Sequence, residues 1–166
     1  MNVVNQKILK IYQGPWEESE GADMPGIAGP IWSYADLFCE MENGLLLRIV
    51  CGETGVINSL PKDVVRIKEK EFQKIEGVRS VINIYEGEEP CIYVLLDDGS
   101  HIEYSLQPGG SRWDLARFDE SYNEDPDDDW EETMTSLVDG KSLKWSQFTE
   151  WYNKSGEVTP NGEPPL

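Results

Sequence analysis

The sequence predicts an α+β fold: a single domain, built mainly from antiparallel strands, with a helix at its C-terminal end. Two stretches, residues 31–51 and 78–106, contain β-prone apolar runs joined by Asn-Gly and Asp-Gly. Aromatic residues then recur at helical spacing between 145 and 153. With 166 residues, 39% of them apolar, the chain can bury one core, which we place in residues 1–157. Residues 158–166 contain three prolines and are expected to be a disordered tail.

The first thirty residues carry two signals. Val4, Ile8 and Ile11 form a helical stripe within residues 3–12; alternation in the same stretch also permits a strand, and we favour the helix. Residues 13–30 contain four glycines and three prolines without periodicity, which predicts a loop. Loops of that length in compact domains are uncommon and are usually functional or mobile.

The stretch 31–51 predicts a β-hairpin. Asn43-Gly44 lies between two apolar runs and suits a two-residue type I′ turn, which needs a positive φ at both central residues. Such a turn places Cys39 opposite Arg48, on the other face of the hairpin from Cys51. We therefore expect no disulfide between these two cysteines.

Residues 59–74 allow two interpretations. Ser59 and Pro61 are residue types found at helix starts, so a short helix is predicted over 59–63. The stretch 64–74 either continues this helix or, because three of its residues are β-branched, begins a strand.

The stretch 78–106 predicts a three-stranded meander with Asp98-Gly99 as a second two-residue turn. The opposite face of this meander is only half polar, so we expect another element to cover part of it. The predicted core face consists of Cys91, Tyr93, Leu95, Ile102, Tyr104 and Leu106, and the polar residues of the opposite face are His101, Glu103 and Ser105.

Three shorter segments complete the chain. Residues 107–112 contain Pro-Gly-Gly and predict a turn or loop. Residues 137–141 are compatible both with a tight turn between short strands and with the end of a helix. An amphipathic helix over 145–153 is predicted from Trp145, Phe148, Trp151 and Tyr152.

The charge of the chain excludes two classes of partner. Lysine and arginine number 14 against 32 aspartates and glutamates, a net charge of −18. Nucleic acids and anionic membranes repel a chain of this sign. No signal peptide is visible, and no apolar run approaches the ~20 residues needed to span a bilayer. Three cysteines without a CxxC pair argue against a disulfide framework, so we expect a cytoplasmic protein.

No catalytic, cofactor-binding or metal-binding residues are predicted. Asp125 opens an acidic cluster, but Trp130 and Ser136 stand where a calcium-binding EF-hand loop needs glycine and glutamate. Phosphate-binding glycine loops and nucleophile motifs are not found. His101 and Glu103 can pair on one strand, and we interpret them as its half-exposed polar face. The three cysteines are interpreted as small core residues.

The acidic run 117–132 is the strongest anomaly of the sequence. It holds nine acidic residues and one arginine, interleaved with aromatic side chains. One interpretation is a solvated loop that keeps the protein soluble. Because solvation needs no aromatic residues, we favour the other interpretation, in which aromatic anchors in an acidic field bind a basic protein. The candidate partner-binding residues are Asp119, Glu120, Asp125, Asp127, Asp128, Asp129, Trp130 and Glu131, with Trp16, Glu17 and Glu18 as a second patch.

In its size, acidity and cytoplasmic character the chain resembles bacterial immunity proteins, the cognate inhibitors of toxins. The resemblance implies a tight complex with one basic toxin, for instance a nuclease, whose active site is occluded, and it implies no catalysis. Two alternatives stay open: a DNA-mimic inhibitor of a DNA-binding protein, and a small hydrolase or accessory module.

Overall fold

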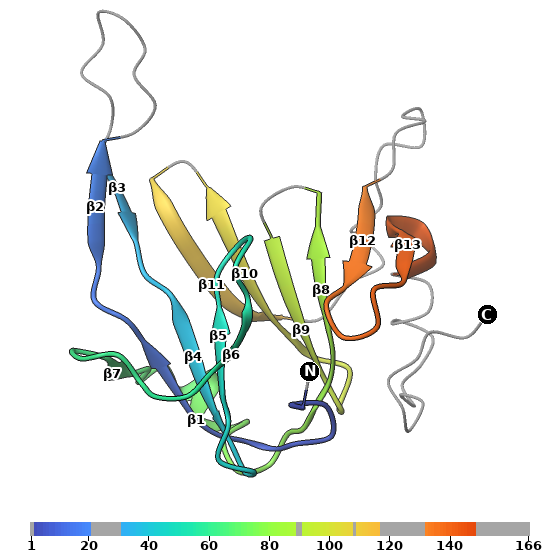
Figure 1. Ribbon diagram of the computed structural model, residues 1–166, viewed down its shortest axis with the longest axis horizontal. Helices are drawn as coiled ribbons and strands as arrows, with labels where there is room; N and C mark the ends of the chain where they lie inside the picture. Colours follow the sequence, from blue (N-terminus) through green and yellow to red (C-terminus); the bar gives the residue numbers. More distant parts are fainter. Residues whose placement is uncertain (1, 21–30, 89–90, 108, 117–131, 149–166) are drawn as a thin grey trace, which may run out of the picture.

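The computed structural model describes residues 2–20, 31–88, 91–107, 109–116 and 132–148. These residues form two sheets that face each other (Figure 1). The strand order is β6-β5-β4-β1-β7 in the smaller sheet and β13-β12-β8-β9-β10-β11-β3-β2 in the larger one. Neighbouring strands pair antiparallel except β3 and β11, which are parallel. The predicted antiparallel sheets are therefore confirmed.

Strands account for most of the described structure. The five-stranded sheet contains β1 (Ile8–Gln13), β4 (Leu37–Met41), β5 (Leu46–Ile49), β6 (Gly55–Ile57) and β7 (Val65–Arg66). The eight-stranded sheet contains β2 (Glu17–Glu20), β3 (Ile31–Tyr34), β8 (Val81–Gly87), β9 (Cys91–Leu96), β10 (His101–Gln107), β11 (Gly110–Ala116), β12 (Thr133–Ser136) and β13 (Ser142–Lys144). Helical structure in the described residues is short: α1 (Lys70–Gln73) and one turn at 145–148.

Two strands of one long hairpin pass from the smaller sheet into the larger one. β1 continues through Gly14 into β2, and β3 continues through Asp36 into β4, as the blue and cyan ribbons of Figure 1 show. The Gly14 amide donates to the Asp36 carbonyl oxygen at 2.9 Å, which joins the two strands at the bend. Strands that switch sheets at a bend are a usual way to form a corner between packed sheets.

This hairpin corrects two predictions. The favoured helix over 3–12 is wrong, because β1 pairs with β4 on one side and with β7 on the other, and these pairings outweigh a weak helical stripe. The predicted loop over 13–30 is wrong at β2, which pairs with β3. Residues 21–30 lie outside the described part of the chain.

Both predicted two-residue turns are one residue longer. The amide of Met41 donates to the Leu45 carbonyl oxygen, and that of Leu96 donates to the Ser100 carbonyl oxygen, each at 2.9 Å. Each turn ends in a glycine with a positive φ, 86° in the first turn and 84° in the second. This is the three-residue hairpin loop, a type I turn followed by a left-handed glycine.

The extra residue in each turn shifts the pairing by one position, so the side chains of one strand change faces relative to those of its partner. Cys39 pairs with Leu47, not Arg48, so it points into the same core against which Cys51 packs. All three cysteines are nevertheless free thiols. In the meander, the side chains of Tyr104 and Ile102 enter the core between the sheets, while Tyr93 and Leu95, predicted to join them, lie on the other face.

Two apolar clusters result, one on each face of the eight-stranded sheet. All six residues of β9 are buried, which confirms that another element covers the second face. The cover includes the helical turn at 145–148, whose Trp145 and Phe148 pack there beside Met134 of β12. The core between the sheets includes Ile8, Ile11, Leu37, Met41, Leu47, Ile49, Ile84, Val94 and Tyr104. The outer cluster consists of Ile82, Tyr85, Cys91, Tyr93, Leu95, Met134, Trp145 and Phe148.

The remaining predictions are partly corrected. No helix forms over 59–63, and the stretch 64–74 contains both alternatives, β7 and then α1, whose Phe72 is buried. The loop predicted over 107–112 is wrong from Gly110 onward, where β11 begins. The turn between β12 and β13 confirms the first interpretation of 137–141. Trp151, Tyr152 and the tail lie outside the described residues, so the amphipathic helix over 145–153 stays a prediction.

Candidate functional site

Trp16 is the most prominent exposed aromatic side chain of the described structure. It follows the bend at Gly14, and 48% of its surface is exposed. Its indole ring stacks on that of Trp113 with ring centroids 5.3 Å apart and an interplanar angle of 16°. Trp113 in turn lies nearly parallel to Tyr104, at 6.3 Å and 7°. The three rings therefore form a row that leads from the core to the surface.

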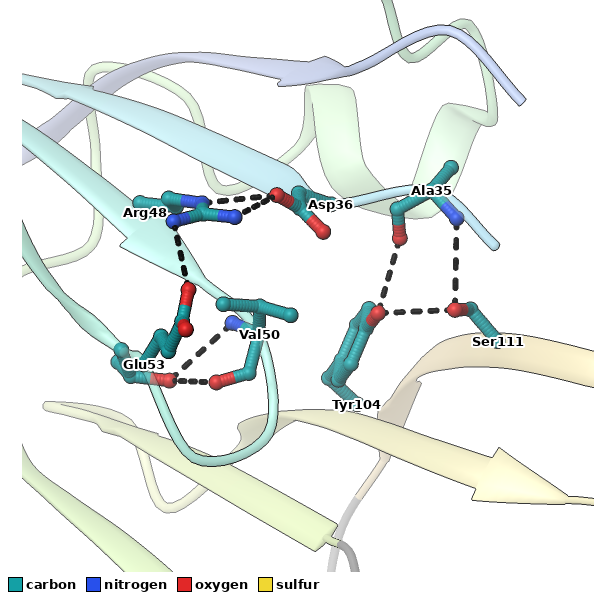
Figure 2. A network of polar contacts seen from close by, with 8 residues as sticks. Ala35, Asp36, Arg48, Val50, Glu53, Tyr104 and Ser111 are labelled. Atoms are coloured by element: carbon teal, nitrogen blue, oxygen red, sulfur yellow. Dashed lines mark hydrogen bonds and ion pairs between the residues drawn. The ribbon is translucent and has the colours of Figure 1, made fainter. Parts of the chain in front are cut away.

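Hydrogen bonds hold the inner end of this row in place. The Tyr104 hydroxyl donates to the Ala35 carbonyl oxygen at 2.9 Å and lies 2.8 Å from the Ser111 hydroxyl (Figure 2). Burial raises the pKa of Tyr104 to about 12, so the phenol stays protonated and able to donate at neutral pH. Since Ala35 lies between β3 and β4, these bonds tie the bend of the long hairpin to β10 and β11.

A close backbone approach fixes the same corner. The Ser33 amide donates to the Gly109 carbonyl oxygen at 3.1 Å, and Ser33 pairs with Gly110 in the parallel contact between β3 and β11. A Cβ atom on Gly110 would overlap the Ser33 carbonyl group. The glycine is therefore required at the point where β11 meets the strand that carries the bend.

The charges near this corner are of two kinds. Asp36 is paired with Arg48, whose Nε and Nη2 atoms both lie 2.7 Å from its carboxylate, and Glu53 lies 3.3 Å from Arg48 (Figure 2). Glu17 and Glu18 on β2 are exposed, and no lysine or arginine of the described residues forms an ion pair with them. Their negative charge is therefore available to a partner. We call Trp16, Glu17, Glu18 and Trp113 the Trp16 surface.

A second group of polar side chains lies in the outer cluster. The Nε2 atom of His101 is 3.9 Å from a carboxylate oxygen of Glu103, and the Cys91 sulfur is 3.7 Å from the other oxygen. Tyr93 packs edge-on against His101 with ring centroids 5.5 Å apart. The predicted pairing of His101 with Glu103 is confirmed. The half-exposed position of His101 is wrong, because only 2% of the residue is exposed.

The electrostatics of this group oppose thiol chemistry. Burial is the main cause that raises the pKa of Cys91 above its usual range, and the Glu103 carboxylate adds to it. The hydrogen bond from His101 lowers the pKa of Glu103. At neutral pH the pair is thus a carboxylate beside a protonated thiol, whereas a reactive cysteine needs a lowered pKa. Burial likewise raises the pKa of Cys39 to about 12 and that of Cys51 to about 11.

One open pocket of about 640 Å³ lies between α1 and the ends of β10 and β11. Arg79 on its wall is 3.3 Å from a carboxylate oxygen of Asp98 and 3.7 Å from one of Asp97, so positive and negative charges largely offset each other there. No group of three potential metal ligands occurs among the described residues. No helix within the residues that the structure describes is long and apolar enough to cross a membrane.

The structure describes only some of the predicted binding residues. Trp16, Glu17 and Glu18 lie together at the start of β2, on the Trp16 surface. Trp113 was missed, because 107–112 was interpreted as a loop and β11 was not expected; the alternation of Ser111, Trp113 and Leu115 was the signal that could have found it. The other predicted binding residues lie outside the described part of the chain: Asp119, Glu120, Asp125, Asp127, Asp128, Asp129, Trp130 and Glu131.

No family model, no curated protein and no solved structure matches the chain.

Proposed function

We propose that the protein is a non-enzymatic acidic binding protein that neutralises a basic partner protein, as a bacterial immunity protein neutralises its toxin in the cytoplasm. The observation that carries the proposal is Trp16: nearly half exposed, yet stacked on Trp113 and followed by two exposed glutamates. Exposed tryptophans at the centre of an interface are among the residues that contribute most binding energy.

The stack lowers the entropic cost of binding. Ordering a free side chain at an interface costs roughly 0.5–1.5 kcal/mol. Trp16 is already held against Trp113, which packs on the core through Tyr104. A partner therefore meets an aromatic surface whose geometry is set before the encounter.

The charge determines what kind of partner this surface suits. A net charge of −18 attracts a cationic protein over the Debye length, about 8 Å at physiological salt, and accelerates association by roughly 10- to 1,000-fold. Nucleases have cationic clefts because they hold phosphates, so occluding such a cleft would inhibit them. In this proposal the acidic residues between 119 and 131 also contribute to the negative charge that attracts the partner.

The enzymatic alternative has less support. In the described group closest to a catalytic arrangement, Cys91 with His101 and Glu103, the cysteine and the histidine are buried and the thiol is held protonated. The DNA-mimic alternative shares the charge argument and differs in the partner, which would be a DNA-binding protein.

The test uses the basic protein encoded beside this gene, purified and titrated into the full chain by calorimetry at 20 and 300 mM NaCl. Trp16→Ala is expected to weaken binding by about 30-fold, which corresponds to about 2 kcal/mol. The double variant Glu17→Gln/Glu18→Gln is expected to slow association several-fold and to reduce the salt dependence.

Matched controls separate the surface from general effects. Val65→Ala removes apolar area from an exposed residue of β7 in the other sheet, and Glu69→Gln/Glu71→Gln makes the same change in net charge next to α1. Both controls are expected to bind like the natural chain. Binding that is independent of salt and unaffected by Trp16→Ala, or a neighbouring gene product that does not bind, would contradict the proposal.

A further inference from the structure

We infer that Trp16 binds an arginine side chain of the partner on the ring face that points away from Trp113, with Glu17 and Glu18 as the counter-charges of that arginine. The inference rests on the proposed function and specifies the chemistry of the contact. Trp113 stacks on one of the two ring faces of Trp16.

The stacking geometry leaves one ring face of Trp16 for a ligand. Trp113 covers the inner face at a centroid distance of 5.3 Å and a tilt of 16°. Since Trp113 stacks on one ring face and 48% of Trp16 is exposed, a ligand can approach the indole only from the side away from Trp113. That face is flat and carries the negative potential of the π-system, which attracts a cation placed within about 6 Å of the ring centroid.

The neighbouring charges select the sign of the ligand. Glu17 and Glu18 follow Trp16 directly in the chain, and within the described residues neither is neutralised by an ion pair. Asp36 is paired with Arg48 and contributes less net charge. An anionic or nucleotide-like ring is repelled at such a position, whereas a cation is attracted by both the ring and the carboxylates.

The shape of the site favours guanidinium over ammonium. Arginine is planar, so it can lie parallel to an indole ring and still direct its five N–H donors sideways at carboxylates. Lysine is a compact, strongly hydrated point charge that cannot satisfy both contacts in this way. A flat indole that is followed in the chain by two exposed glutamates therefore fits arginine better than lysine.

The row of rings also makes the site rigid. Trp113 is parallel to Tyr104 within 7°, and the Tyr104 hydroxyl is held by Ala35 and Ser111. Trp16 thus does not need to be ordered when the cation arrives, so a weak contact can contribute measurable affinity.

The experiment uses the full chain with ¹⁵N-labelled tryptophan and three probe peptides, Ac-Gly-Xaa-Gly-Xaa-Gly-NH₂, in which Xaa is arginine, lysine or the uncharged citrulline. The indole N–H signal of Trp16 is assigned as the one lost in Trp16→Phe. We expect this signal to shift saturably with the arginine peptide, with at least threefold weaker binding of the lysine peptide and no saturable shift with the citrulline peptide.

Two charge variants complete the test. Glu17→Gln/Glu18→Gln is expected to weaken the binding of the arginine peptide at least threefold. Glu69→Gln/Glu71→Gln, which makes the same change in net charge elsewhere, is expected to leave this binding unchanged. Equal affinity for arginine and lysine peptides, or a Trp16 signal that does not move, would overturn the arginine site. If the arginine peptide binds as expected but the basic partner protein does not, the proposed function fails and the arginine site stands.

Discussion

Gly110 is the residue on which the contact between β3 and β11 depends. Its φ of 128° lies where side chains are strained, and a Cβ atom would overlap the Ser33 carbonyl. We expect Gly110→Ala to lower the free energy of unfolding by about 3 kcal/mol or more, since it adds a steric clash to roughly 1–3 kcal/mol of backbone strain. Urea unfolding followed by tryptophan fluorescence measures this loss.

The preceding glycine is a matched control. Gly109 has a φ of 101°, and nothing lies within 4 Å of a Cβ built on it. Gly109→Ala therefore keeps the backbone strain and omits the clash, so its loss should be clearly smaller. Equal losses for the two variants would show that strain alone, and not the close approach to Ser33, requires glycine.

Glu103 makes the stability depend on pH in a defined direction. His101 lowers the pKa of Glu103 in the folded state below its ordinary value of 4.5. Ionised Glu103 therefore stabilises the fold above pH 4.5, and this contribution is lost as the pH falls through the lowered pKa. Glu103→Gln should be less stable than the natural chain at pH 7, with the difference shrinking as the pH falls below 4.5. Urea midpoints at a series of pH values measure it.

The pairing partner provides the control for this prediction. In a His101→Asn background the interaction that lowers the pKa of Glu103 is gone. The effect of Glu103→Gln should then depend much less on pH over the same range. A difference that stays constant in both backgrounds would mean that the charge of Glu103 is not what stabilises the fold.

At the scale of elements, the helical turn at 145–148 acts as the lid of the outer cluster. Phe148 is fully buried and lies edge-on to Tyr85 with ring centroids 4.9 Å apart. Phe148→Ala should lower the free energy of unfolding by about 3–5 kcal/mol, as expected for a large aromatic residue removed from a core.

An exposed apolar residue tests whether this loss reflects burial. Val78 is 52% exposed, so Val78→Ala should change stability by less than about 0.5 kcal/mol in the same unfolding assay. A loss below 1 kcal/mol for Phe148→Ala would show that the turn is not docked on the sheet in solution.

The hairpins show how far the sequence could predict elements. Asn43-Gly44 and Asp98-Gly99 marked both turns correctly, but each dipeptide also fits a three-residue turn that ends in a left-handed glycine. The hydrophobic pattern usually decides the register, because a shift by one residue exchanges the faces. Here β9 is apolar at every position and buried on both faces, so the pattern gave no preference.

The Trp16 surface shows a similar limit. Trp16, Glu17 and Glu18 could be selected as a patch from local composition alone. The contact of Trp16 with Trp113 could not, because it depends on the parallel pairing of β3 with β11, which joins segments far apart in the sequence. The bend of β1 into β2 was hidden for the same reason, since Gly14 gave a loop signal although it lies at a corner between two sheets.

For the whole molecule, the net charge of −18 gives salt two opposite effects. Screening relieves repulsion within the fold, so raising NaCl from 20 to 200 mM should raise the unfolding temperature by about 2–5 °C. The same change should slow association with a basic partner about tenfold or more, because it screens the attraction. Calorimetry and stopped-flow fluorescence on the same samples compare the two.

The prediction is that salt raises the unfolding temperature and lowers the association rate. The double variant Glu17→Gln/Glu18→Gln should reduce the effect of salt on the association rate more than it reduces the effect of salt on the unfolding temperature. Faster association at higher salt would contradict a role of the negative charge in steering the partner.

The bent hairpin also determines how the molecule carries mechanical load. Trp16 stands where β1 turns into β2, and β1 is bonded along its length to β4 in the smaller sheet. In the proposed complex, a force on Trp16 would therefore load several backbone hydrogen bonds between β1 and β4 in shear, instead of peeling a loop off the surface.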